Sequence, residues 1–123
     1  MAVVRVLLVD DQPAYLRALA SVVRETTGFE VVGEAATGEV AVSMAGALRP
    51  DLVLMDVNLP GIDGLEATRR LRVMPGPPLV LLLSTYDEDA GELFAEDCGA
   101  AGYVTKSAFG PDRLEELWGA TSS

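Results

Sequence analysis

The chain has 123 residues, half of them hydrophobic and fewer than a quarter charged, which is enough for one hydrophobic core and unlike a disordered segment. Its net charge of −10 argues against direct binding to nucleic acid or to an anionic membrane. There is no histidine and one cysteine, Cys98, so a disulfide framework and a cysteine zinc site are both excluded. No apolar run approaches the ~18 residues of a membrane span, so we expect a cytoplasmic protein without membrane contact.

The first part of the chain predicts strand, helix, strand and helix in turn. Residues 3–9 are nearly all apolar, which indicates a central strand. Pro13 suits the first turn of a helix whose apolar residues keep helical spacing until Gly28. Residues 29–35 mix acidic and apolar side chains, which favours a strand at a sheet edge, and residues 41–48 repeat the helical spacing.

The middle of the chain holds the most informative run. Residues 51–55 are apolar after the first position and predict a strand buried on both faces, with Asp56 at the point where it leaves the core. A charge there must be paired, bound to a metal or functional, because burying it alone is too costly. After a proline–glycine turn, Asp63 is a good N-cap for a helix to about Arg72, and Glu66 completes a capping-box-like arrangement.

The last part adds two further strands and two helices. Residues 79–83 are fully apolar and predict another central strand, followed by an acidic helix over residues 87–99. Residues 101–105 predict a short strand, and Gly110 with the proline after it opens a final helix. Five strands alternating with five helices imply parallel strands with helices on both faces. The expected fold is α/β, a flavodoxin-like doubly wound (βα)5 domain over residues 1–123 with sheet order 2-1-3-4-5.

Polar side chains follow four of the five predicted strands. Asp10 and Asp11 follow the first strand, Asp56 the third, Ser84 the fourth and Lys106 the fifth. Because the carboxyl ends of parallel strands share one rim of the sheet, we expect these side chains to converge there. Lys106 is also the only lysine in the sequence.

Three clustered carboxylates repel one another, by roughly 3 kcal/mol for each pair at ~5 Å and an effective dielectric constant of ~20. One carboxyl can stay protonated, or a hard cation can bind. Oxygen ligands on separate loops suit Mg²⁺ better than calcium, since no EF-hand-like loop is present. With a hydroxyl and an ammonium beside it, Asp56 could attack phosphorus in line and become an acyl phosphate.

Taken together, these residues resemble the receiver domain of two-component response regulators, over almost the whole chain. Each motif is weak alone, but the four in this order and at these separations are highly specific: residues 9–11, residues 54–64, Ser84 and residues 99–106. The segments 33–35 and 65–67 are similar to the NarL/FixJ subfamily, whose members usually carry a DNA-binding domain after the receiver.

The resemblance implies a role for each polar residue. Asp56 would accept the phosphoryl group of a sensor histidine kinase's phosphohistidine. Asp11 and Asp56 would bind Mg²⁺ directly, Asp10 through water and Asn58 through its backbone carbonyl. Lys106 would pair with Asp56 and then with phosphoryl oxygens.

The resemblance also implies a switch and partners. Ser84 would bind a phosphoryl oxygen, and Tyr103 would turn inward as Ser84 moves. Homodimerisation would follow phosphorylation, and DNA would be bound only through an output domain absent from this chain. The domain would catalyse no reaction besides its own phosphorylation and dephosphorylation. Two positions depart from the common family pattern: Ser107 stands where many receivers have proline, and Thr85 is larger than the usual alanine or glycine.

Each residue also has an ordinary structural explanation. Asp10 and Asp11 could cap the first helix, Ser84 and Lys106 could be solvated strand ends, and Tyr103 could be a packing residue. Three other functions compete with a signalling switch. They are an interaction module without phosphorylation, a Mg²⁺-dependent phosphatase with an aspartyl nucleophile, and dinucleotide binding, for which the glycine-rich turn is missing.

Overall fold

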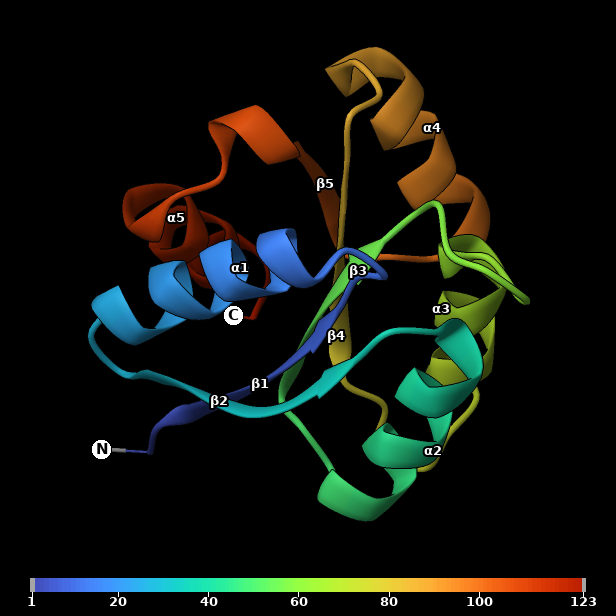
Figure 1. Ribbon diagram of the computed structural model, residues 1–123, viewed down its shortest axis with the longest axis horizontal. Helices are drawn as coiled ribbons and strands as arrows, with labels where there is room; N and C mark the ends of the chain where they lie inside the picture. The colour runs from blue at the N-terminus through green and yellow to red at the C-terminus, as the bar shows by residue number, and fades with distance from the viewer. Residues whose placement is uncertain (1, 123) are drawn as a thin grey trace.

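One parallel sheet of five strands forms the centre of the molecule (Figure 1). The computed structural model describes residues 2–122, and its strands lie in the order β2-β1-β3-β4-β5, as predicted. The two strands with mixed composition, β2 and β5, are at the edges. The strand bounds are β1 Val4–Val9, β2 Phe29–Ala35, β3 Leu52–Asp56, β4 Leu79–Ser84 and β5 Gly102–Thr105.

Helices cover both faces of this sheet. In Figure 1, α1 and α5 lie on one side of the strands, and α2, α3 and α4 lie on the other. None of the helices within residues 2–122 has the length and apolar character needed to cross a bilayer. The helix bounds are α1 Pro13–Glu25, α2 Gly38–Leu48, α3 Gly64–Arg72, α4 Glu88–Cys98 and α5 Pro111–Thr121.

The core consists of two apolar clusters, one on each face of the sheet. Successive residues of a strand point to opposite faces, so Val6 and Leu8 pack with α1 and α5, whereas Leu7 and Val9 pack with α2, α3 and α4. All five residues of β3 are buried, Asp56 included. β3 therefore lies in the interior of the sheet with both faces covered, and its last residue is the carboxylate-bearing Asp56.

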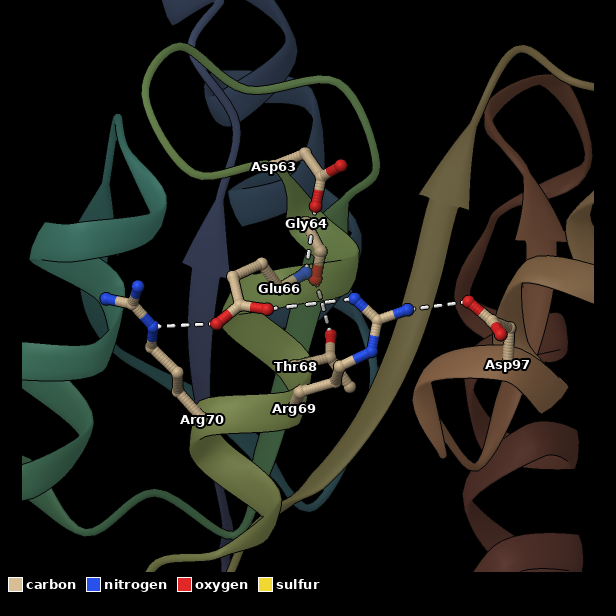
Figure 2. Close-up of polar contacts among 7 residues, drawn as sticks. All are labelled: Asp63, Gly64, Glu66, Thr68, Arg69, Arg70 and Asp97. Carbon is tan, nitrogen blue, oxygen red and sulfur yellow. Dashed lines mark hydrogen bonds and ion pairs between the residues drawn. The ribbon is translucent and has the colours of Figure 1, made fainter.

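Helix α3 starts as the sequence predicts, with one difference (Figure 2). The Asp63 carboxylate accepts a hydrogen bond from the Glu66 amide at 2.8 Å, which makes Asp63 the N-cap. The Glu66 side chain does not complete the capping box. Its carboxylate instead lies 3.0 Å from Arg70 Nε and 3.7 Å from Arg69 Nη1, because both arginines follow within one turn. Arg69 also contacts Asp97 of α4 at 2.6 Å, so α3 and α4 are joined by an exposed ion pair.

Two other local features differ from expectation. Helix α2 begins at Gly38, earlier than the apolar spacing from residue 41 indicates, because the Thr37 hydroxyl accepts from the Val40 amide and caps it. A short 3₁₀ turn, Lys106–Ala108, follows β5 directly. Cys98, the only cysteine in the sequence and the last residue of α4, is buried in the apolar cluster on that face of the sheet.

Candidate functional site

The register of the sheet brings the predicted polar residues to one rim. The register of β1 and β3 ends with Val9 opposite Met55, so the next residues, Asp10 and Asp56, come to the same level of the rim. Asp56 pairs with Leu83, so Ser84 lies one residue further out, and Lys106 one residue beyond that. The lysine side chain is long enough to reach back over both positions. Convergence at the carboxyl rim is therefore a direct result of strand order and register.

Three carboxylates form a cluster at this rim. Each of Asp10, Asp11 and Asp56 offers a carboxylate oxygen, and these atoms lie within 4.8 Å of one another. Asp10 and Asp56 are buried, whereas Asp11 is exposed. Asp10 Oδ1 accepts from the Gln12 amide at 2.9 Å, and Gln12 rather than an aspartate takes the N-cap position of α1. The aspartates thus face the rim instead of capping the helix.

Asp56 is the least satisfied member of this cluster. The residue is only 4% exposed, and Oδ1 has no hydrogen-bond partner among residues 2–122. Burial first, and then the charge of Asp10, raise the pKa of Asp56 to about 6, although Lys106 opposes both effects. A buried, unpartnered oxygen between acidic neighbours fits a divalent cation with oxygen ligands such as Mg²⁺.

Lys106 provides the positive charge of the site. Its Nζ lies 2.7 Å from Asp10 Oδ2 and 3.5 Å from Asp56 Oδ2. The structure therefore places Lys106 closer to Asp10 than to Asp56, the partner that the family resemblance implies. Both carboxylates are almost fully buried, so this contact is only weakly screened by solvent.

A cavity of about 260 Å³ opens onto the cluster. Ser84 is buried at the end of β4 and lines this cavity together with Thr85 of the following turn. Asn58 also lines it, and its side-chain carbonyl accepts a hydrogen bond from the Tyr86 hydroxyl at 3.1 Å. The cavity is large enough for several waters or a phosphoryl group, and a carboxylate, a hydroxyl and an ammonium all line it.

Tyr103 is turned into the protein. Its ring is buried, and its hydroxyl donates to the Tyr86 carbonyl at 2.6 Å. Burial raises the pKa of Tyr103, which keeps the hydroxyl protonated and able to donate. The ring lies so close to Gly91 of α4 that a Cβ at this position would collide with it. Tyr86 in turn packs edge-on against Phe94, so Tyr103 connects to the rim through the turn after β4.

The loop between β3 and α3 is shaped by two glycines. Gly61 has φ +76°, a conformation that favours glycine, and the Glu39 carboxylate of α2 accepts from the adjacent Ile62 amide at 3.1 Å. Gly64 donates its amide to the Val57 carbonyl at 2.8 Å, and a Cβ there would strike the Asp56 carbonyl. Close approach of the loop to the end of β3 thus depends on Gly64.

Sequence reasoning missed two residues that touch the site. Tyr15 of α1 faces Lys106, with the ring centroid 4.3 Å from Nζ, and Tyr86 hydrogen-bonds Asn58. Burial, and then the charges of Asp10 and Asp56, raise the pKa of Tyr15 to about 12. Tyr15 lies within α1, so a search of strand ends could not have found it. Tyr86 follows β4 by two residues, as Asp11 follows β1, and the same search could have included it. Tyr15 and Lys106 are 91 residues apart in the sequence, so no short motif could indicate that they are in contact.

Comparison with known structures supports the fold over the full length. The signal receiver domain of the response regulator NarL from Mycobacterium tuberculosis superposes with a TM-score of 0.89, at 30% identity, over 100% of this chain and 99% of that one. A LuxR-family two-component response regulator from Aurantimonas gives 0.86 at 36% identity, over 97% of this chain and 84% of that one.

Comparison with curated proteins gives the same family. Response regulator GacA of Pseudomonas aeruginosa is 40% identical over 114 residues, which are 93% of this chain and 51% of the relative. A protein-glutamate methylesterase/protein-glutamine glutaminase of Alkalilimnicola ehrlichii is 43% identical over 104 residues, 84% of this chain and 27% of the relative. The chain therefore spans about half or less of the length of these relatives.

The family description "Response regulator receiver domain" matches residues 6–118, which contain every residue of the rim. The GacA and NarL matches agree with the NarL/FixJ-type subfamily that the sequence resembles. This chain belongs to the response regulator receiver domain family.

Proposed function

We propose that this domain is a phosphorylation-controlled switch whose phosphoacceptor is Asp56. The observation that carries the proposal is the buried, unpartnered Oδ1 of Asp56, beside two further carboxylates and within reach of the one lysine. Because no other carboxylate of the rim is both buried and free of a protein partner on one oxygen, Asp56 is the group that a ligand must satisfy.

The proposed reaction transfers a phosphoryl group from a phosphohistidine of a sensor histidine kinase. An oxygen of Asp56 attacks phosphorus, the P–N bond breaks, and the imidazole leaves with its electron pair and takes up a proton. Asp56 then carries an acyl phosphate. Lys106 balances charge on the transferred oxygens, and Ser84 lies in the same cavity, from which its hydroxyl can donate to one of them.

Mg²⁺ fits the donor set at the rim and would neutralise charge on the transferred group. Receiver domains bind this ion at an acidic pocket, and Asp10, Asp11 and Asp56 form such a pocket here. We assign direct binding to Asp11 and Asp56, binding through water to Asp10, and a backbone carbonyl ligand to Asn58. The hydrogen bonds that Asp10 already makes to Gln12 and Lys106 support its indirect role.

We also propose that the switch controls a DNA-binding output domain and thereby transcription. The GacA relative is about twice as long as its match to this chain. Phosphorylation would change the face formed by α4 and β5, where Tyr103 packs against Gly91, and homodimers would form there. A lone buried cysteine and a histidine kinase partner fit a cytoplasmic location.

Intact-mass spectrometry after incubation with acetyl phosphate tests this function. With Mg²⁺ the wild-type chain should gain one phosphoryl group, and it should gain none in EDTA. Asp56→Asn should gain none in either condition, whereas Asp89→Asn, an exposed aspartate of α4, should behave as the wild type. Equal labelling of the wild type and Asp56→Asn would remove Asp56 from its role.

A further inference from the structure

The position of Lys106 is not explained by its own segment of chain. β5 ends at Thr105, and the 3₁₀ turn that begins with Lys106 has no side-chain cap. A lysine side chain has a flexible four-carbon stem and would sample many conformations if ion pairs were its only contacts. Its two carboxylate neighbours both attract it, Asp10 at 2.7 Å and Asp56 at 3.5 Å, so charge alone does not define one position between them.

Tyr15 contacts Lys106 at both ends of the residue. The ammonium lies over the aromatic ring, 4.3 Å from its centroid, and the phenol hydroxyl donates to the Lys106 carbonyl at 3.3 Å. The Tyr15 side chain, on α1, thus contacts both the ammonium and the backbone of Lys106, which directly follows β5. No other aromatic ring among residues 2–122 makes such a contact with Lys106.

Tyr15 is itself held in place. It lies in the first turn of α1, whose helical bonds begin with the Tyr15 and Leu16 amides donating to the Gln12 carbonyl. Its half-buried ring packs against the apolar cluster beneath α1 and α5. The ring is therefore a fixed surface, whereas the lysine stem is flexible. The ring attracts the Lys106 ammonium through its π electrons but, unlike the carboxylates of Asp10 and Asp56, it carries no net charge.

We propose that Tyr15 is a positioning residue that holds Lys106 between Asp10 and Asp56. The ring fixes the ammonium by a cation–π contact, and the hydroxyl fixes the backbone from which the side chain starts. This inference rests on the proposed function, because the position of Lys106 matters for phosphoryl transfer to Asp56. It adds a residue from α1, an element that otherwise supplies nothing to the rim.

The test reads the lysine directly. Because Lys106 is the only lysine in the sequence, labelling with ¹³C,¹⁵N-lysine gives one side-chain spin system. In the wild type and in Tyr15→Phe, the ring should shift the Lys106 ε-proton resonances upfield of free lysine. In Tyr15→Leu these resonances should return to the values of free lysine. Phe29→Leu removes a half-buried ring from the same cluster, far from Lys106, and should leave them unchanged.

The rate of phosphorylation by acetyl phosphate with Mg²⁺ gives the second measurement. We expect Tyr15→Leu to react about fivefold more slowly than the wild type, because the cation–π contact is lost. Tyr15→Phe should keep the ring and lose no more than about threefold. Phe29→Leu should react at the wild-type rate.

Wild-type resonances at free-lysine values would overturn the proposal, and this result needs no variant to fold. An unchanged rate in folded Tyr15→Leu would also overturn it. The two measurements separate this inference from the proposed function. A wild-type chain that takes up no phosphoryl group would contradict the function, while the lysine resonances would still report whether Tyr15 holds Lys106.

Discussion

At the scale of single residues, Asp56 combines two properties that oppose each other. Its carboxylate belongs to a fully buried strand, yet it faces Asp10 across the register and has an unpartnered oxygen. Both burial and the neighbouring charge disfavour ionisation, so the pKa rises to about 6. The ionised carboxylate is therefore a cost to the unliganded fold, which a bound cation or a phosphoryl group with its counter-ions would relieve.

This cost predicts how stability depends on pH. The Asp56 pKa is about 6 when folded, above the ordinary value of 3.8, so the folded state binds the proton more tightly. Its contribution to stability therefore falls as pH rises from about 4 to about 6 and stays low above that. Without Mg²⁺, Asp56→Asn should be about 1–3 kcal/mol more stable than the wild type at pH 7.5.

Urea unfolding with EDTA at pH 7.5 and at pH 4 measures this difference. The stability gained by Asp56→Asn should shrink at pH 4, where the wild-type carboxyl is largely protonated in the folded state. A variant less stable than the wild type at pH 7.5 would show that Lys106 outweighs burial and Asp10.

At the scale of elements, the loop between β3 and α3 determines how Asn58 approaches Asp56. Glu39 of α2 binds the loop through the Ile62 amide, and Gly64 lets α3 start against the end of β3. The Arg69–Asp97 pair then links α3 to α4 (Figure 2). Because that pair is exposed, we expect it to add at most about 1 kcal/mol.

Gly64 should therefore be the sensitive position of this loop. In Gly64→Ala the added Cβ would strike the Asp56 carbonyl, and the backbone must shift, so we expect a loss of about 2–4 kcal/mol in the free energy of unfolding. The matched control is Gly46→Ala on α2, where a Cβ meets open space and helix propensity should add about 0.5–1 kcal/mol. Denaturant unfolding distinguishes the two, and a neutral Gly64→Ala would mean that the loop can move away.

Much of this architecture could be predicted from apolar runs. The strands ending at Val9, Asp56 and Ser84 are interior because their sequences suit burial on both faces. Element ends were less predictable, since they depend on local caps. Thr37 begins α2 three residues before its apolar spacing does, and the Glu66 side chain binds arginines in place of the loop.

The residues of the site also fall into those that could be predicted from the sequence and those that could not. The side chains at strand ends could be placed from strand order alone, because parallel strands deliver them to one rim. The ion pair of Lys106 with Asp56 was expected, but its shorter contact with Asp10 was not, since the relative distances depend on side-chain packing. Tyr15 could not be found either, because its contact joins α1 to the turn after β5 and leaves no pattern in the chain.

At the scale of the whole molecule, the apolar clusters on both faces of the sheet are enclosed by a surface with an excess of negative charge. The net charge of −10 and the clustered carboxylates both add repulsion that a divalent cation would reduce. A ligand that binds only the folded state stabilises it by mass action. The proposed binding of Mg²⁺ should therefore raise the stability of the entire domain.

Thermal unfolding measures this coupling. Mg²⁺ at 100 times its dissociation constant should stabilise the wild type by about 2.7 kcal/mol. Asp11→Asn should lose most of this effect, because Asp11 is one of the three clustered carboxylates, whereas Asp89→Asn should retain it. Equal stabilisation of all three proteins would place the ion elsewhere on the acidic surface.

Chemical trapping identifies most directly which carboxylate takes the phosphoryl group. Reduction of the phosphorylated chain with borohydride converts an aspartyl phosphate into homoserine, and tandem mass spectrometry of the peptides locates it. We expect homoserine at position 56, in the peptide that carries β3, and unmodified aspartates at positions 10 and 11. Homoserine at position 10 or 11, or at none of the three, would contradict this expectation.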